Sequence, residues 1–290
     1  MSDTLQRFLF EELAIRGDLV QLDATWKALQ EKHDYPEPVL RLLGEVMTAS
    51  VLLSATLKHK SRLTMQIQGN GPVPFLVVEC THDKNLRGMA HYAEDIQPGT
   101  LPELIGDGRL AITLEPRDSS ERYQSIVELS GNTLAEAIDD YLCRSEQLDT
   151  RIWLAVSETR TAGLLIQKLP ANQSAEEQEG WNRVEQLSAT ITSKELLNLD
   201  AQLVIRRLYH EEDVRVFEAE PVCFRCSCSK TRVANMLRQL GIDEIHNILE
   251  EEQIIEVTCE FCNQQYLFDA VDAEQLFATE VTYRTPDTRH

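Results

Sequence analysis

The chain of 290 residues is 42% hydrophobic and 26% charged, a composition typical of a globular protein that buries a full-sized core. Its formal net charge of −20 disfavours nucleic acids and acidic membrane surfaces as partners. The N-terminal segment lacks the basic start and the continuous apolar run of a signal peptide. No segment reaches the apolar length of a membrane span, so we expect a cytoplasmic protein whose thiols are kept reduced.

The first 170 residues predict a mixed domain of strands and helices. Apolar residues at helical spacing predict a helix from Leu5 to Leu13 that stops at Gly17. Two prolines precede a long predicted helix, with apolar positions from Leu40 to Val51. The predicted strands cover 63–67, 75–80, 110–114, 123–129, 152–156 and 164–169, and a helix with a capping box covers 134–142. These elements predict an α+β domain that ends near Pro170.

Residues 171–221 form a predicted helical linker. Its start, up to Gly180, is polar and acidic, and apolar residues from Trp181 to Ile191 then share one helical face. The pair Thr192 and Glu195 has the spacing of a second capping box. Two interpretations follow. Either these helices are packed permanently on the first domain, or they form a mobile segment whose apolar face is buried only conditionally.

Residues 222–290 form a predicted C-terminal module. A helix is predicted for Ser229–Leu240, followed by Gly241 at the position that commonly ends a helix. Ile254–Val257 and Tyr266–Phe268 are predicted to pair as a hairpin. The module contains little apolar sequence, so we expect a metal ion to be its main organiser.

Five of the seven cysteines lie between Cys223 and Cys262. An odd number of cysteines with tight local spacing indicates metal binding rather than a disulfide framework. The last pair, Cys259 and Cys262, has zinc-knuckle spacing, and four thiolates satisfy a tetrahedral zinc ion. We therefore predict one zinc per chain, which in model peptides stabilises a small domain by about 10–16 kcal/mol. Cys80 and Cys143 are expected to be small buried hydrophobes.

The first half of the zinc site is ambiguous, because three cysteines compete for two places. Cys223 and Cys226 form a C-x-x-C pair, whereas Cys226 and Cys228 form a C-x-C pair. Spacing alone favours the first pair, since C-x-x-C is the commoner zinc spacing. Nearby basic residues favour thiolates or simply balance the charge of the site; they are Arg225, Lys230, Arg232 and Arg238.

Three functions compete for this cysteine pattern. A nucleic-acid-binding zinc ribbon needs a basic face with aromatics, and four bases are few on a chain of charge −20. A dithiol oxidoreductase using Cys259 and Cys262 usually places the pair at a helix N-terminus, whereas this pair lies between predicted strands. Phosphate-binding loops and protease motifs are absent from the sequence, so nothing in it indicates an enzyme. A regulatory zinc switch on a protein-binding domain fits best.

The sequence resembles the redox-regulated heat-shock chaperones of thirty-three kilodaltons, found mainly in bacteria. The resemblance covers almost the whole chain. Its most specific mark is a C-x-C followed about thirty residues later by a C-x-x-C. The matching segments are Gln68–Pro72, Leu86–Ala90, Gly106–Leu110, Tyr141–Leu148, Cys226–Ser229 and Cys259–Cys262.

The resemblance assigns the zinc to Cys226, Cys228, Cys259 and Cys262 and leaves Cys223 as an extra cysteine. It implies that the reduced, zinc-bound form is inactive. Oxidation then forms the disulfides Cys226–Cys228 and Cys259–Cys262 and expels the zinc. It also implies that the module unfolds and that the exposed apolar surface binds unfolding proteins without ATP. Active family members tend to be dimers.

Client proteins would then bind to apolar residues of the linker. The candidates are Trp181, Leu197, Leu203 and Leu208, which follow the polar start of this segment. Loss of zinc would remove the module that follows the linker and make these residues available as a binding surface. The high negative charge would keep the opened protein and its clients in solution.

Overall fold

The computed structural model describes residues 3–57, 59–118, 121–145, 148–170 and 175–281. The chain divides into two compact units, Met1–Arg225 and Cys226–His290. The three-part division into 1–170, 171–221 and 222–290 stays a prediction. Each unit has its own hydrophobic core and is described by itself below.

The first unit contains an antiparallel sheet, sheet A, and a mixed sheet, sheet B. Sheet A has the order β10-β1-β2-β9-β8, with β11 also paired to β1, and sheet B has the order β12-β5-β4-β3-β6-β7. Sheet A comprises β1 (Thr4–Phe10), β2 (Ile15–Leu22), β8 (Thr150–Val156), β9 (Thr161–Lys168), β10 (Val214–Val216) and β11 (Glu220–Pro221). Sheet B comprises β3 (Ser61–Gln68), β4 (Phe75–Cys80), β5 (Asn85–His91), β6 (Arg109–Pro116), β7 (Tyr123–Glu128) and β12 (Cys223–Phe224). Each of the six strands predicted between residues 63 and 169 is present.

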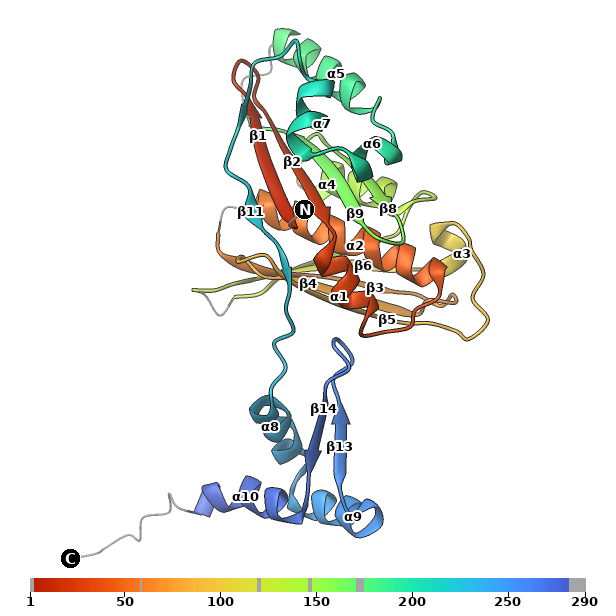
Figure 1. Ribbon diagram of the computed structural model, residues 1–290, viewed down its shortest axis with the longest axis vertical. Helices are drawn as coiled ribbons and strands as arrows, with labels where there is room; N and C mark the ends of the chain where they lie inside the picture. The colour runs from red at the N-terminus through yellow and green to blue at the C-terminus, as the bar shows by residue number, and fades with distance from the viewer. Residues whose placement is uncertain (1–2, 58, 119–120, 146–147, 171–174, 282–290) are drawn as a thin grey trace, which may run out of the picture. The chain divides into compact units, whose positions relative to one another are not determined.

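Helix α2 (Glu37–Thr56) lies between the two sheets and contacts strands of both (Figure 1). Most of its residues are buried, because sheet A covers one side and sheet B the other. Among the described residues it is the one helix whose length and composition would suit a membrane span, yet 78% of that stretch is buried inside the protein. α2 is therefore the core helix that the sequence predicted.

Three further helices complete this part of the fold. The predicted helix over 134–142 is present as α4, which packs on β8. Two short helices were not predicted, because neither carries a full apolar stripe. The bounds are α1 (Ala24–Gln30), α3 (Leu101–Ile105) and α4 (Leu134–Ser145).

The predicted helix from Leu5 to Leu13 is wrong, because this segment forms β1. Sheet A is covered on both faces, so Leu5 points into the core around α2 while Phe8 and Phe10 point to the opposite face. Burial on both faces breaks the alternation of a half-exposed strand and imitates helical spacing. Gly17 lies in β2 opposite Phe8, where an added Cβ would stand 2.0 Å from the ring, so its role is close packing rather than ending a helix.

The linker helices lie on the outer face of sheet A (Figure 1). They are α5 (Ala175–Ser188), α6 (Ser193–Asn198) and α7 (Ala201–Leu208). The predicted capping box begins α6, where the Thr192 hydroxyl accepts the N–H of Glu195. The first residues of the predicted linker, 171–174, lie outside the described residues.

The helical prediction fails after Leu208, where the chain becomes extended. β10 and β11 pair antiparallel with β1, and β12 pairs parallel with β5. We call residues 214–224 the strap, because this segment joins the edge of sheet A to the edge of sheet B. The free edge of β1 supplies hydrogen bonds that a local sequence pattern does not show.

The second unit is small. It contains α8 (Lys230–Leu240), α9 (Ile242–Glu252), the hairpin β13 (Ile255–Thr258) and β14 (Gln265–Phe268), and α10 (Ala270–Val281). The predicted helix and hairpin are present, and Ser229 caps α8 by accepting the N–H of Arg232. The buried residues of its core are Ala234, Leu237, Ile245, Ile255, Phe268, Ala273 and Leu276.

A half-buried carboxyl on α4 makes the stability of the first unit depend on pH. Burial raises the pKa of Asp139 to about 7, and the carboxylates of Glu185 and Asp140 act in the same direction. Arg151 and the N–H of Ile152, which donates to Asp139 at 3.0 Å, act against this rise. At neutral pH, ionisation of Asp139 therefore costs folding free energy.

Asp139→Asn is expected to stabilise the protein at alkaline pH. The folded-state pKa exceeds the unfolded value of about 3.9, so the stabilising contribution of the carboxyl is fully present below about pH 4 and is lost as the pH rises through about 7. Asparagine keeps an acceptor for Ile152 and cannot ionise. Urea denaturation should show that the free energy of unfolding rises by roughly 2–4 kcal/mol near pH 8 and hardly changes near pH 4. Asp140→Asn, at a half-exposed carboxylate paired with Arg144, is the control, and an equal gain there would contradict the assignment.

Candidate metal centre

Two short segments of the second unit carry the four cysteines. Cys226 and Cys228 lie on the extended chain just before α8. Cys259 and Cys262 lie on the turn between β13 and β14, where the N–H of Cys262 donates to the Cys259 carbonyl at 3.3 Å. Asn263 closes this turn with a positive φ of 56°, a conformation that asparagine tolerates better than most residues. The hairpin and the cap of α8 thus hold both pairs in place.

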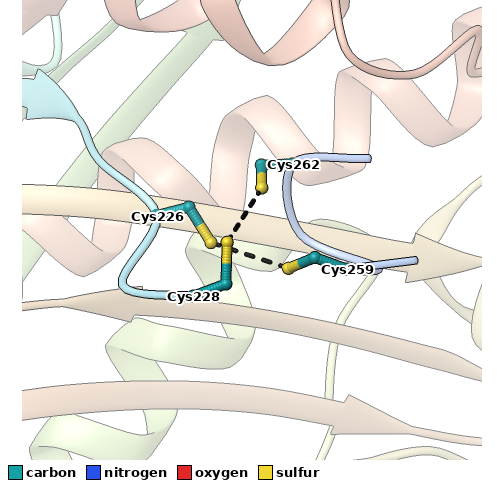
Figure 2. A group of neighbouring side chains, drawn as sticks. All are labelled: Cys226, Cys228, Cys259 and Cys262. Atoms are coloured by element: carbon teal, nitrogen blue, oxygen red, sulfur yellow. Dashed lines mark hydrogen bonds between the residues drawn. The ribbon is translucent and has the colours of Figure 1, made fainter. Parts of the chain in front are cut away.

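The four Sγ atoms converge on one point (Figure 2). All lie within 4.8 Å of one another, with 3.7 Å between Cys226 and Cys259 and 3.4 Å between Cys228 and Cys262. A tetrahedral zinc site with Zn–S bonds of about 2.3 Å has sulfur–sulfur separations of about 3.8 Å. The four thiols therefore suit one tetrahedral metal ion, and zinc is the ion that such a donor set favours.

The thiols favour their protonated forms when no cation balances them. Burial raises the pKa of Cys259, and the neighbouring Cys226 thiol adds to the rise, while the N–H groups of Phe261 and Cys262 oppose it. Burial also raises the pKa of Cys262, with contributions from the other thiols. A divalent cation at the centre would reverse this balance, because coordination deprotonates a thiol outright. The cluster is thus suited to exchange protons for a metal ion.

A tyrosine hydroxyl contacts the cluster. Tyr266 on β14 donates its O–H to Cys228 Sγ at 3.0 Å. This hydrogen bond, the largest cause, raises the pKa of Tyr266 to about 12. The sequence marked Tyr266 only as a strand residue, because the pattern of a hairpin does not show which side chain reaches a cysteine of another segment.

Three of the four nearby basic residues have structural partners, and Arg238 is held by the carbonyl of Leu276 at 2.7 Å. Lys230 pairs with Asp272 at 3.1 Å and lies over the ring of Phe268, 5.1 Å from its centroid. Arg232 donates to the Ser227 hydroxyl at 2.7 Å, between the two cysteines of the first pair. These contacts indicate that the basic side chains stabilise the fold of the second unit.

The other three cysteines lie apart from the cluster. Cys223 is exposed on β12, where its thiol donates to the Asn85 side chain at 3.0 Å. Cys80 is buried in β4, as predicted, and donates to the Ser54 hydroxyl. The prediction that Cys143 is buried is wrong, because it lies nine residues after Leu134 on α4, on the opposite side of the helix. All seven cysteines are free thiols.

The predicted client-binding residues lie on the linker helices and differ in exposure. Trp181 and Leu208 are 3% and 7% exposed and pack in the cluster formed with the outer face of sheet A. Leu197 is half-buried against the same cluster, whereas Leu203 is 50% exposed. Most of the predicted client-binding surface is therefore covered by sheet A.

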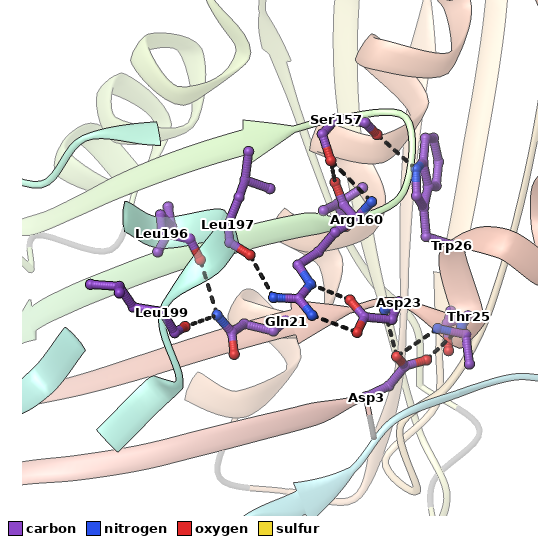
Figure 3. A network of polar contacts seen from close by, with 12 residues as sticks. Asp3, Gln21, Asp23, Thr25, Trp26, Ser157, Arg160, Leu196, Leu197 and Leu199 are labelled. Atoms are coloured by element: carbon purple, nitrogen blue, oxygen red, sulfur yellow. Dashed lines mark hydrogen bonds and ion pairs between the residues drawn. The ribbon is translucent and has the colours of Figure 1, made fainter. Parts of the chain in front are cut away.

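Polar contacts also hold the linker on sheet A (Figure 3). Arg160, from the turn between β8 and β9, forms two hydrogen bonds to the carboxylate of Asp23, one of them 2.7 Å long. The same guanidinium donates to the carbonyl of Leu197 on α6 at 2.5 Å. We call Arg160, Asp23 and Gln21 the latch. The sequence did not predict it, because its members are brought together only by the tertiary fold.

The latch reaches both the end of α6 and the strap. The Gln21 side chain donates to the carbonyls of Leu196 and Leu199, at 3.0 and 2.7 Å, and thereby satisfies groups that a helix end leaves unpaired. The carboxylate of Asp3 accepts three N–H groups at the start of α1, including that of Asp23 in the latch. The carbonyl of Asp3 accepts the N–H of Val222 in the strap at 3.0 Å.

Comparison with known proteins agrees with this architecture. Residues 3–269 match the family described as Hsp33 protein. Two curated relatives, from Methylobacillus flagellatus and Nitrosococcus oceani, are named 33 kDa chaperonin. They are 45% and 48% identical to this chain over 100% and 99% of its length and 99% of their own. A crystal structure of the 33 kDa chaperonin from Thermotoga maritima has the same fold, with a TM-score of 0.82 at 21% identity, covering 96% of this chain and 99% of that one.

The predicted α+β fold class is confirmed by this structural match, and the predicted family resemblance is confirmed by the family match and the relatives. A match over most of the chain, together with relatives of this similarity, shows that the chain belongs to the Hsp33 family.

Proposed function

We propose that this protein is a chaperone, not an enzyme, and that a zinc-thiolate switch controls it. The observation that carries the proposal is the convergence of four thiols in a unit with a small apolar core. Cys226, Cys228, Cys259 and Cys262 bind one zinc ion per chain in the reduced form. Cys223 is not a ligand, because its thiol lies outside the group of four and is hydrogen-bonded to Asn85.

An oxidant of the peroxide class switches the site. One thiolate attacks a peroxide oxygen to give a sulfenic acid and hydroxide, and its neighbour displaces a second hydroxide to form the disulfide. The pairs are Cys226–Cys228 and Cys259–Cys262, as the family resemblance implies. Two peroxides thus convert four zinc-bound thiolates into two disulfides, four hydroxide ions and a free zinc ion. The Sγ atoms of Cys226 and Cys259 lie 3.7 Å apart and those of Cys228 and Cys262 lie 3.4 Å apart, separations that leave room for the metal between the two pairs.

Loss of zinc unfolds the second unit and releases the linker helices. Zinc is the largest single contribution to the stability of such a module. Once the linker leaves sheet A, the apolar residues around Trp181 and Leu208 become accessible, together with the sheet residues that they cover. Exposed apolar area of this kind binds the apolar segments of unfolding proteins without nucleotide.

The remaining properties follow from composition and family resemblance. The active form is a homodimer, and the protein works in the cytoplasm, where reduced thiols are the resting state. The net charge of −20 disfavours nucleic acids and membranes as partners and keeps client complexes soluble.

The test compares reduced and peroxide-treated protein in an aggregation assay. A chemically denatured client is diluted without nucleotide, and light scattering is followed while zinc is measured by elemental analysis. The reduced protein should hold about one zinc per chain and leave aggregation unchanged. The oxidised protein should hold little zinc and suppress scattering. Equal suppression by both forms would defeat the redox switch.

Cys80→Ala and Cys143→Ala are expected to leave peroxide activation intact. Cys80 is buried and hydrogen-bonded to Ser54, so oxidants reach it slowly. Cys143 is exposed on α4, and neither cysteine belongs to the group of four. Activation is measured as suppression of client aggregation after a fixed peroxide exposure. Failure of either variant to become active would show that a thiol outside the cluster takes part in the switch.

A further inference from the structure

Tyr266 is placed by the hairpin to reach the first pair of cysteines. Its backbone pairs with Val257 across β13 and β14, and its ring packs against the core of the second unit. The phenol oxygen lies 3.0 Å from Cys228 Sγ. The ring is therefore held by packing and strand pairing, and the hydroxyl is the part of the residue that meets the thiol.

The second pair of cysteines is hydrogen-bonded in another way. Cys259 accepts N–H groups from Phe261 and Cys262, and Cys262 accepts the N–H of Gln264. These donors belong to the backbone of the turn, so they are present whenever the turn is folded. The donor to Cys228 belongs to a side chain and can be removed without changing the backbone.

A hydrogen bond to a metal-bound thiolate has two chemical effects. It orients the sulfur lone pairs toward the metal and strengthens the site, as donors around metal ligands commonly do. It also withdraws charge from the sulfur, which lowers the nucleophilicity of the thiolate toward peroxide. Both effects oppose oxidative release of the metal.

We propose that Tyr266 is a positioning residue that sets the zinc affinity and the oxidant threshold of the switch through its O–H bond to Cys228. This inference rests on the proposed zinc-thiolate function of the cluster. Loss of the bond would leave the cluster able to bind zinc, but with weaker binding and with a Cys228 thiolate that reacts faster.

The test uses Tyr266→Phe in the full-length chain, which removes the O–H and keeps the ring. Competition with a chromophoric chelator under reducing conditions should show zinc affinity lowered about tenfold. Peroxide-driven zinc release should be several-fold faster. In the cobalt-substituted variant, the thiolate-to-cobalt charge-transfer band should move to lower energy, because sulfur lone pairs without a donor are held less tightly. Tyr123→Phe, at an exposed position on β7, is the matched control and should change none of these readings.

The outcomes separate this inference from the proposed function. If the unaltered protein binds one zinc and releases it with peroxide, but Tyr266→Phe matches it in affinity, release rate and cobalt spectrum, the role of Tyr266 is refuted and the switch stands. If the unaltered protein binds no zinc, the proposed function itself fails. A variant whose second unit is unfolded by circular dichroism in the presence of zinc would show that the hydroxyl is needed for folding, and this would also refute a tuning role.

Discussion

Cys262→Ser is expected to abolish stable zinc binding and to unfold the second unit of the reduced protein. The four thiols converge within 4.8 Å, and a hydroxyl in place of one of them is a far weaker zinc ligand. Structural zinc contributes about 10–16 kcal/mol to modules of this kind, more than a small apolar core can replace. Elemental analysis should show a zinc ratio near zero, and limited proteolysis should cut the second unit rapidly. The same variant should suppress client aggregation without any oxidant.

Cys223→Ser is the matched control for this prediction. Its thiol is exposed and hydrogen-bonded to Asn85, outside the group of four. The variant should keep one zinc per chain and stay inactive when reduced. Loss of zinc from Cys223→Ser, with retention in Cys228→Ser, would show that the C-x-x-C pair suggested by spacing alone is the true half-site.

Arg160→Ala is expected to release the linker from sheet A while the zinc site stays intact. The side chain holds Asp23 by two hydrogen bonds and Leu197 by a third, and both partners lie in the first unit. Of these three bonds only the one to Leu197 reaches the linker, and removing this charge-assisted hydrogen bond should favour the released linker by about 2 kcal/mol, which corresponds to about a thirtyfold rise in its population. The reduced variant should therefore gain partial chaperone activity with a full complement of zinc. Proteolysis within α5–α7 and aggregation suppression measure the two effects.

Arg183→Ala is the control for the latch variant. Arg183 on α5 pairs with Glu212 inside the linker itself, so this ion pair does not join the linker to sheet A. Arg183→Ala should change neither the proteolysis within α5–α7 nor the suppression of client aggregation. If Arg160→Ala remains inactive and resists proteolysis as the unaltered protein does, the latch does not restrain the linker and the helices are permanent core.

The sequence predicted the elements whose patterns are local. The six strands predicted between residues 63 and 169, the core helix α2 and the capping box at Thr192 all carry their signals within a few residues, and the structure contains them, although strand β5 was missed. It misread β1 because sheet A is covered on both faces. It missed the strap because β10, β11 and β12 are stabilised by strand edges far away in the chain.

At the candidate site, too, the sequence predicted what is local and missed what depends on long-range contacts. Spacing identified the two groups of cysteines, since close ligand pairs are a local signal. It favoured the pair that includes Cys223, whereas the tertiary structure brings Cys226 and Cys228 together with the second pair. Tyr266 and Arg160 could not be found from the sequence, because each acts on a group more than thirty residues away.

The central claim is that zinc release by thiol oxidation creates the binding surface. Its most direct test follows zinc release, free thiols and client light scattering in one sample after peroxide is added. The account predicts that four thiols are lost for each zinc released, and that aggregation suppression rises with zinc release and not before it. Suppression that appears while the zinc and all four thiols are retained would contradict it, as would complete release of zinc without any gain in suppression.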